Sequence, residues 1–172
     1  SSPNDLEKYC SLRLYEHPLP YWLITEDVVS LLNGLETRLP FLDQRLVYKS
    51  KPFGYDQAIL NGILSDAINY NSKNNITGAL ICRDDIYLQL LEGPKYEVNL
   101  TFEKISNDDR HLEIELLLKE YCNKRIFPGW NMKDDPARTW FWNKEEINSG
   151  IFNKIPRAKI IEVFEKIANQ IN

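Results

Sequence analysis

A glutamine stands in the middle of the apolar run at residues 86–91, Ile-Tyr-Leu-Gln-Leu-Leu, which is typical of a buried β-strand. A buried amide without a partner costs about 1–3 kcal/mol, so Gln89 should have a dedicated hydrogen-bond partner inside the fold. A structural bond to a neighbouring strand would satisfy Gln89 taken alone. Two further polar residues stand near by in the predicted fold: Tyr48 lies at the centre of an apolar strand, and Asn71 lies at the end of a helix. A phenol facing an amide makes a complete hydrogen bond, and three such groups converging predict a cleft for a planar ligand rich in donors and acceptors.

The hydrophobic pattern places these residues on defined elements. We expect strands at 45–50, 76–82, 86–91 and 113–120, and helices at 55–71 and 96–106. Residues 127–132 predict a turn leading into a short last strand that carries Trp130 and Met132. The order β-α-β-β-α-β plus one short strand predicts an α+β fold, a ferredoxin-like sandwich. Its topology brings the strand of Tyr48 close to the strand of Gln89.

Both ends of the chain differ in character from this central part. We expect three parts: an N-terminal extension at 1–44, a central domain at 45–135 and a helical extension at 136–172. The apolar stripe of 157–171 should pack on the open face of the sheet. In the N-terminal part a helix is predicted near 26–33, with Thr25 as its N-cap, and we expect it to dock on the central domain or on a second copy.

Composition excludes several classes of function. The 172 residues carry a formal net charge of −4 and no basic stripe, which argues against nucleic acid as a partner. The three cysteines are widely spaced and form no CxxC pair, which predicts neither a disulfide framework nor a metal site and favours a cytoplasmic location. No apolar run approaches the roughly 18 residues that a membrane-spanning helix needs.

Several motifs together resemble one family. The segments RLVYKS, NITGALI, IYLQLLEGP, NDDRH and FPGWNM occur in the order and spacing of the BLUF domain, a flavin-binding sensor of blue light. The resemblance covers about residues 42–133. It implies the same ferredoxin-like fold, with a non-covalently bound FAD, FMN or riboflavin whose ring lies between the two helices.

The resemblance also implies roles for individual residues. Tyr48 matches the tyrosine that gives an electron and a proton to the excited flavin, and Gln89 matches the glutamine between that tyrosine and the flavin. Asn71 matches the asparagine that bonds the C4 carbonyl and N3 edge of the ring. Ser50 matches a serine that often contacts the pocket.

Five more positions carry over from the resemblance. Asp108 and Arg110 match the acid and base near the pyrimidine edge and ribityl side, and Trp130 and Met132 match the variable pair on the last strand, one of which approaches the glutamine. Tyr70 stands where the family often has a polar residue or histidine, and we expect it to stack near the ring.

Some residues have simpler structural interpretations. Taken singly, Tyr48 would be a core tyrosine, Asn71 a helix end, Asp108 with Arg110 a surface ion pair, and Trp130 core filling; only their joint order favours the flavin site. His111 is expected at the start of a strand and Glu92 in a structural role at the hairpin end. Asn75 replaces a usual glycine and can adopt a left-handed backbone at modest cost.

The predicted function is a light switch and not an enzyme, because rearrangement of the Gln89 amide leaves no net chemistry. A protein effector or a second copy of the chain would receive the signal. The alternatives are a ferredoxin-like interaction module without a pigment, and a light-independent flavin enzyme, which would need a substrate cavity in the space that Tyr48 and Gln89 should occupy.

A second, weaker resemblance covers about residues 12–47. The stretch GLETRLPFLD is similar to part of the synthetase domain of the asparagine synthetase family. The SGGxDS nucleotide-binding loop of that family is absent, so we expect no ATP-dependent activity from this segment. A fragment of such a fusion remains an alternative interpretation.

Overall fold

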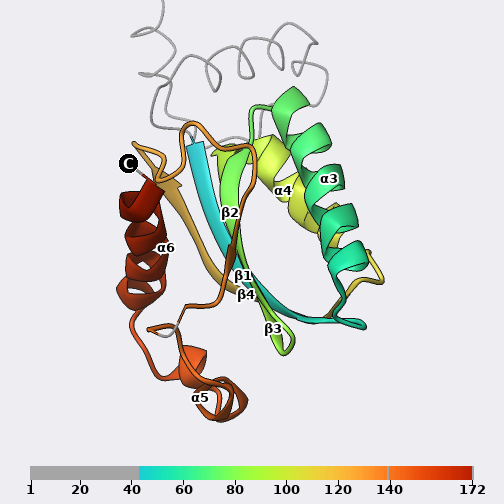
Figure 1. Ribbon diagram of the computed structural model, residues 1–172. Helices are drawn as coiled ribbons and strands as arrows, with labels where there is room; N and C mark the ends of the chain where they lie inside the picture. Colours follow the sequence, from blue (N-terminus) through green and yellow to red (C-terminus); the bar gives the residue numbers. More distant parts are fainter. Residues whose placement is uncertain (1–42, 139, 172) are drawn as a thin grey trace, which may run out of the picture. The chain divides into compact units, whose positions relative to one another are not determined.

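The computed structural model describes residues 43–138 and 140–171, so the predictions for the first 42 residues, including the 26–33 helix and most of the synthetase-like segment, lie outside the described residues. The described residues form a five-stranded sheet with helices on both faces (Figure 1). The elements in chain order are β1 (Asp43–Pro52), α3 (Gln57–Lys73), β2 (Thr77–Arg83), β3 (Ile86–Pro94), α4 (Lys95–Ser106), β4 (His111–Cys122), β5 (Lys133–Pro136), α5 (Lys144–Asn148), the 3-10 turn η2 (Ile151–Asn153) and α6 (Arg157–Ile171). The predicted α+β ferredoxin-like arrangement is confirmed.

The strand order is β4-β1-β3-β2-β5, which puts β3 at the centre with β1 on one side of it and β2 on the other. Both neighbours of β1 run antiparallel to it. In the β1–β3 register Tyr48 lies directly opposite Gln89, and on the other side of β3 the partner of Gln89 is Leu80. Residues directly opposite in an antiparallel pair share one face of the sheet, so the predicted neighbours Tyr48 and Gln89 project to the same side.

Helices α3 and α4 cover that side (Figure 1). The side chain of Asp56 caps α3 by accepting a hydrogen bond from the backbone N–H of Ile59. The helix ends at Asn74, and Asn75 follows with φ of 53°, the left-handed conformation expected from its place before the ITG motif. This turn directs the chain straight into β2 below the helix.

Close packing of the β2–β3 hairpin explains the glycine of the ITG motif. A Cβ atom on Gly78 would overlap with the backbone carbonyl oxygen of Leu90 on the facing strand. The backbone N–H of Gly78 also donates to the carbonyl of Trp130, 3.0 Å away. Only glycine fits between these two segments without moving one of them.

Helix α6 covers the opposite face of the sheet, as its apolar stripe predicts (Figure 1). Phe164 is completely buried there, and its ring meets the ring of Phe127 edge to face, with centroids 6.4 Å apart. Phe141 and Trp142, which precede α5, and Phe152 of η2 complete the core between α6 and the sheet. None of the helices in the described part of the chain is long and apolar enough to cross a membrane.

The predicted last strand is displaced along the chain. It was expected to carry Trp130 and Met132, whereas β5 begins at Lys133 and pairs in parallel with β2. Residues 127–132 are irregular because their polar groups bond to other elements: the Asn131 side chain donates to the carbonyl of Ile76, and the Asn131 carbonyl accepts from Asn71. Pairing with β2 starts only where these bonds end.

The packing of α6 predicts a large cost for truncating its central aromatic residue. Phe164→Ala should lower the free energy of unfolding by about 3–5 kcal/mol, because the ring is completely buried against the sheet. Urea denaturation measures the change, and Glu165→Ala on the exposed side of the same helix is the control. A loss below about 1 kcal/mol would contradict the docking of α6 on the sheet.

Candidate functional site

The buried pair Tyr48 and Gln89 forms the floor of the site. Tyr48 is 0% exposed and Gln89 2% exposed, and the Tyr48 hydroxyl donates a hydrogen bond to Gln89 Oε1. The other end of the Gln89 amide, Nε2, lies 3.4 Å from the sulfur of Met132. Burial raises the pKa of the Tyr48 hydroxyl well above its ordinary value, so this phenol keeps its proton at neutral pH.

A cavity of about 460 Å³ lies above this floor, where α3, α4 and the start of β4 meet. Its volume is in the range typical of small-molecule sites. Its lining residues come from α3, α4, β3 and the turn before β4: Ile63, Asp66, Ala67, Asn69, Tyr70, Asn71, Lys73, Gln89, Thr101, Lys104, Ile105, Asp108, Arg110 and His111. The structure therefore brings Gln89, Asn71, Tyr70, Asp108 and Arg110 together, as predicted.

Asn71 contributes an unused acceptor to the cavity wall. Its Nδ2 donates to the carbonyl of Asn131 at 2.8 Å, while its buried Oδ1 has no hydrogen-bond partner among the described residues. Leaving a buried carbonyl oxygen unpaired costs about 1–3 kcal/mol, which a ligand N–H could recover. The N3–H of a flavin ring is a donor of this kind, so the residues present fit that group.

Asp108 and Arg110 form the charged rim of the cavity. The Arg110 guanidinium bonds both oxygens of Asp108 and reaches Asp66 on α3 at 2.9 Å. Hydrogen bonds from Arg110 lower the pKa of the Asp108 carboxyl, and bonds to Asp108 and then Asp66 raise the pKa of Arg110. The guanidinium thus ties the end of α4 to α3 across one end of the cavity.

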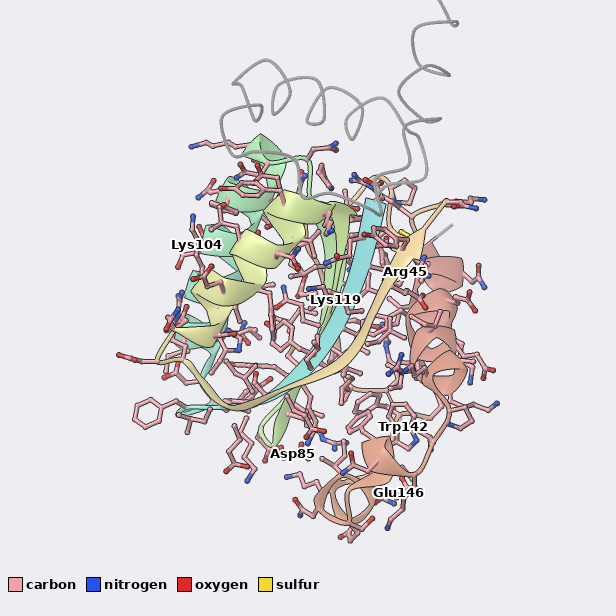
Figure 2. The ribbon with its side chains drawn as sticks, turned by 180° about the vertical axis from the view of Figure 1, so that it is seen from behind. Arg45, Asp85, Lys104, Lys119, Trp142 and Glu146 are labelled. Atoms are coloured by element: carbon pink, nitrogen blue, oxygen red, sulfur yellow. The ribbon has the colours of Figure 1, made fainter. Side chains whose placement is uncertain are left out.

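Tyr70 and Lys104 meet across the other part of the rim. The ammonium of Lys104, which is labelled in Figure 2, lies 3.9 Å from the centre of the Tyr70 ring. This is a cation–π contact between α4 and α3. Tyr70 lines the cavity, as the prediction that it stacks near a ring requires. Its role toward a ligand stays a prediction.

Ser50 and His111 are joined to the site in a way the sequence did not indicate. Ser50 is buried but does not line the cavity; its Oγ lies 2.8 Å from Nδ1 of His111. His111 begins β4 as predicted, yet it also lines the cavity and its ring lies edge-on to Tyr48 at 6.1 Å. Burial lowers the pKa of His111 to about 4. The sequence signal was its place directly after Arg110.

Met132 and Trp130 separate in the structure. Met132 is buried beside Gln89, whereas Trp130 is 43% exposed and lines a different groove with Arg125 and Phe127. Trp130 is therefore neither core filling nor part of the cavity wall. Of the predicted pair, Met132 is the residue that approaches the glutamine.

Glu92 has the structural role that its position at the hairpin end predicts. Its buried carboxylate accepts from the backbone N–H groups of Ile126 and Phe127 and bonds Arg45 at 2.8 Å. Arg45, labelled in Figure 2, was not singled out in the sequence. Together these bonds hold the start of the 127–132 segment against the end of β3.

Within the described ranges no group of acidic, histidine and cysteine side chains could hold a metal ion.

Comparison with known proteins identifies what this chain is similar to. The model of the BLUF family, sensors of blue light using FAD, matches residues 44–133. The blue light- and temperature-regulated antirepressor BluF of Escherichia coli is 29% identical over 92 residues, 54% of this chain and 22% of that protein. The photoactivated adenylate cyclase subunit beta of Euglena gracilis is 30% identical over 94 residues, 53% of this chain and 11% of that protein. The chain thus spans only a small part of these relatives.

Solved structures show the same architecture. The ground state of BlsA matches with a TM-score of 0.59 and 27% identity, over 73% of this chain and 87% of that one. The dark state of BlrB, a BLUF protein, matches with a TM-score of 0.62 over 77% of this chain and 99% of that one; at 24% identity this likeness shows the fold.

The lowered pKa of His111 predicts a loss of stability in weak acid. In the unfolded chain His111 binds a proton near pH 6.5, whereas in the folded protein it binds one only near pH 4. Protonation of His111 therefore favours the unfolded chain, so the folded protein has its full stability above pH 6.5 and loses stability as the pH falls toward 4. The free energy of unfolding should fall by about 2 kcal/mol between pH 7 and pH 5.

Urea denaturation at both pH values measures this dependence. His111→Phe should remove most of it, whereas the control His17→Gln should keep it. An equal pH dependence in wild type and His111→Phe would show that His111 is not buried in its neutral form.

Proposed function

Because the chain belongs to the BLUF family of blue-light sensors using FAD, we propose that its described part is a flavin-bound photoreceptor switched by Tyr48 and Gln89. The observation that carries this proposal is the buried hydrogen bond from the Tyr48 hydroxyl to Gln89 on the floor of the cavity. FAD is the cofactor of the family, and FMN or riboflavin would fit the same ring site.

The residues that would hold the cofactor come from α3 and from the turn before β4. Asn71 offers a buried acceptor, Arg110 and Asp108 offer charged groups at the rim, and Tyr70 offers an aromatic face. FAD, when bound, supplies absorption of blue light and, once excited, the capacity to take up an electron and a proton. Tyr48 would give them up: its neutral phenol is buried and hydrogen-bonded to Gln89, which lines the cavity.

Gln89 is the residue that would store the change. Its amide has an acceptor end, held by the Tyr48 hydroxyl, and a donor end, held by the sulfur of Met132. Exchanging the two ends reverses donor and acceptor toward Tyr48 and toward the cavity without moving the backbone. A buried network with two such arrangements is a bistable element. It converts no substrate, so this part of the chain is a sensor and not an enzyme.

The signal would leave through residues 127–132. Met132 contacts Gln89, and the neighbouring Asn131 is bonded to Asn71 and Ile76. We propose that a protein effector or a second copy of the chain receives it, and not nucleic acid or a membrane. The names of the relatives, an antirepressor and adenylate cyclase subunits, support a protein partner or a fused effector.

The remaining predictions about the chain stay proposals. We propose a cytoplasmic location, supported by the unpaired thiols of Cys82 and Cys122. We also propose that the chain consists of an N-terminal extension at 1–44, the BLUF domain at 45–135 and a C-terminal extension at 136–172.

The photoactive pair predicts a defined spectral phenotype. The full chain with FAD should absorb blue light and shift slightly to the red on illumination, recovering in darkness. Tyr48→Phe and Gln89→Ala should each keep FAD but lose this shift; Tyr48→Phe should also cost about 1–3 kcal/mol of stability, because Gln89 Oε1 loses its donor.

Absorption spectra before and after blue light measure the shift, with Tyr121→Phe at an exposed position of β4 as the control. A normal photocycle in Tyr48→Phe would refute the role of Tyr48. A protein that stays colourless after reconstitution with excess FAD would instead favour the interaction module without a pigment.

Asn71 predicts a separate effect on binding. Asn71→Ala removes the unpaired acceptor and the bond to Asn131, so the dissociation constant for FAD should rise about tenfold or more, equivalent to about 1.4 kcal/mol. Flavin fluorescence titration measures it. Asn61→Ala, whose amide is exposed on the same helix, should bind as wild type; equal affinity of both variants would show that Asn71 does not hold the ring.

A further inference from the structure

We infer that Ser50 and His111 form a positioning pair: the Ser50 hydroxyl donates to Nδ1 of His111 and fixes the imidazole in the tautomer that carries its proton on Nε2. The neutral ring then supports Tyr48 from the side and offers an N–H donor to an oxygen of the bound flavin. The ligand half of this inference rests on the proposed function.

The hydrogen bond between Ser50 and His111 determines which nitrogen of the His111 ring carries the proton. Ser50 Oγ and His111 Nδ1 are 2.8 Å apart, and this is the one side-chain hydrogen bond of Ser50 to the residues that the structure describes. If Nδ1–H donated to the serine oxygen, the buried hydroxyl hydrogen would have no acceptor, at a cost of about 1–3 kcal/mol. If the hydroxyl donates instead, both groups are satisfied and the ring proton sits on Nε2.

The surroundings of His111 keep the ring neutral and aimed at the site. It is buried between Tyr48 of β1 and Tyr87 of β3, with ring centroids 6.1 and 5.3 Å away. The charged groups that act on it, Asp108 and Arg110, have opposite signs and neutralise each other in their own ion pair. Nε2 makes no hydrogen bond within residues 43–138 and 140–171, and the ring lines the cavity.

Two consequences follow for the ring and its neighbour. The ring of Tyr48 packs against His111 and against Phe102 of α4, with centroids 6.1 and 5.4 Å away, so a shift of His111 would change the packing that directs the Tyr48 hydroxyl toward Gln89. Ser50, two residues after Tyr48 on the same face of β1, fixes His111 and through it both Tyr48 and the Nε2–H donor. Ser50 would therefore act on the flavin through His111 and not by touching it.

The chain offers a direct measurement of the tautomer. It has two histidines, so His17→Gln in the full chain leaves His111 as the single source of imidazole signals. With ¹⁵N-labelled histidine and no FAD, we expect the ¹⁵N shift of an unprotonated Nδ1 and of a protonated Nε2, unchanged from pH 8 down to pH 5.5. A protonated Nδ1 would overturn the inference without any variant at the site.

Variants of Ser50 and addition of FAD complete the test. Ser50→Ala should give a mixture of both tautomers and weaken FAD binding several-fold, Ser50→Thr should restore the single tautomer, and the exposed control Ser72→Ala should change nothing. FAD should shift the Nε2–H signal. An unchanged tautomer in Ser50→Ala would overturn the positioning role, and FAD bound without a change at Nε2 would overturn the contact. Failure to bind FAD at all would overturn the proposed function, while the tautomer measured without FAD would still decide the pair.

Discussion

The hydrogen bond between the Tyr48 hydroxyl and the Gln89 amide is the constraint on which the rest of the fold depends. Both polar groups stand in the middle of apolar strands, so β1 and β3 must be neighbours in a register that places them on one face. A slip by one residue would turn Tyr48 toward the second core and leave Gln89 unpaired. The central position of β3 and its antiparallel pairing with β1 both serve this contact.

Charge is distributed so that the neutral groups of the site could rearrange while the ions around them keep their partners. The neutral groups are Tyr48 and Gln89 at the floor and Asn71 in the cavity wall, each able to change partners at the cost of a hydrogen bond. The ions stand at the rim, where Arg110 is bonded to Asp108 and Asp66. At the end of β3 the buried carboxylate of Glu92 accepts hydrogen bonds from two backbone N–H groups and from the guanidinium of Arg45. Such charge-assisted bonds are stronger than bonds between neutral groups. A network of neutral groups thus lies inside a frame of ion pairs.

The sequence predicts most of the fold because its periodicity is strong, and it fails where structure depends on a distant partner. The strand of Gln89, the helix at 55–71 and the stripe of α6 are visible from residue spacing, and Asn75 adopts the left-handed turn expected of it. The strand β5 is short, with the sequence Lys-Asp-Asp-Pro, and no alternation marks it; it exists because β2 offers an edge. Trp130 was placed wrongly because an aromatic residue in a turn does not reveal which side it faces. The contact of His111 with Ser50 joins residues 61 positions apart, which no local pattern shows.

The two ends of the Gln89 amide are held with unequal strength, and this inequality would set the direction of the proposed switch. Its oxygen accepts from a phenol, a good donor, whereas its nitrogen faces the thioether sulfur of Met132, a weak acceptor. Breaking the contact between Gln89 Nε2 and the Met132 sulfur therefore costs less free energy than breaking the bond between Gln89 Oε1 and the Tyr48 hydroxyl. Once Nε2 leaves the sulfur, Met132 would lose this contact, while the backbone around it would stay anchored through the Trp130 carbonyl and Asn131. A hydrogen-bond change at the floor would then first become a side-chain movement at residue 132, next to the strand that leads to the C-terminal helices.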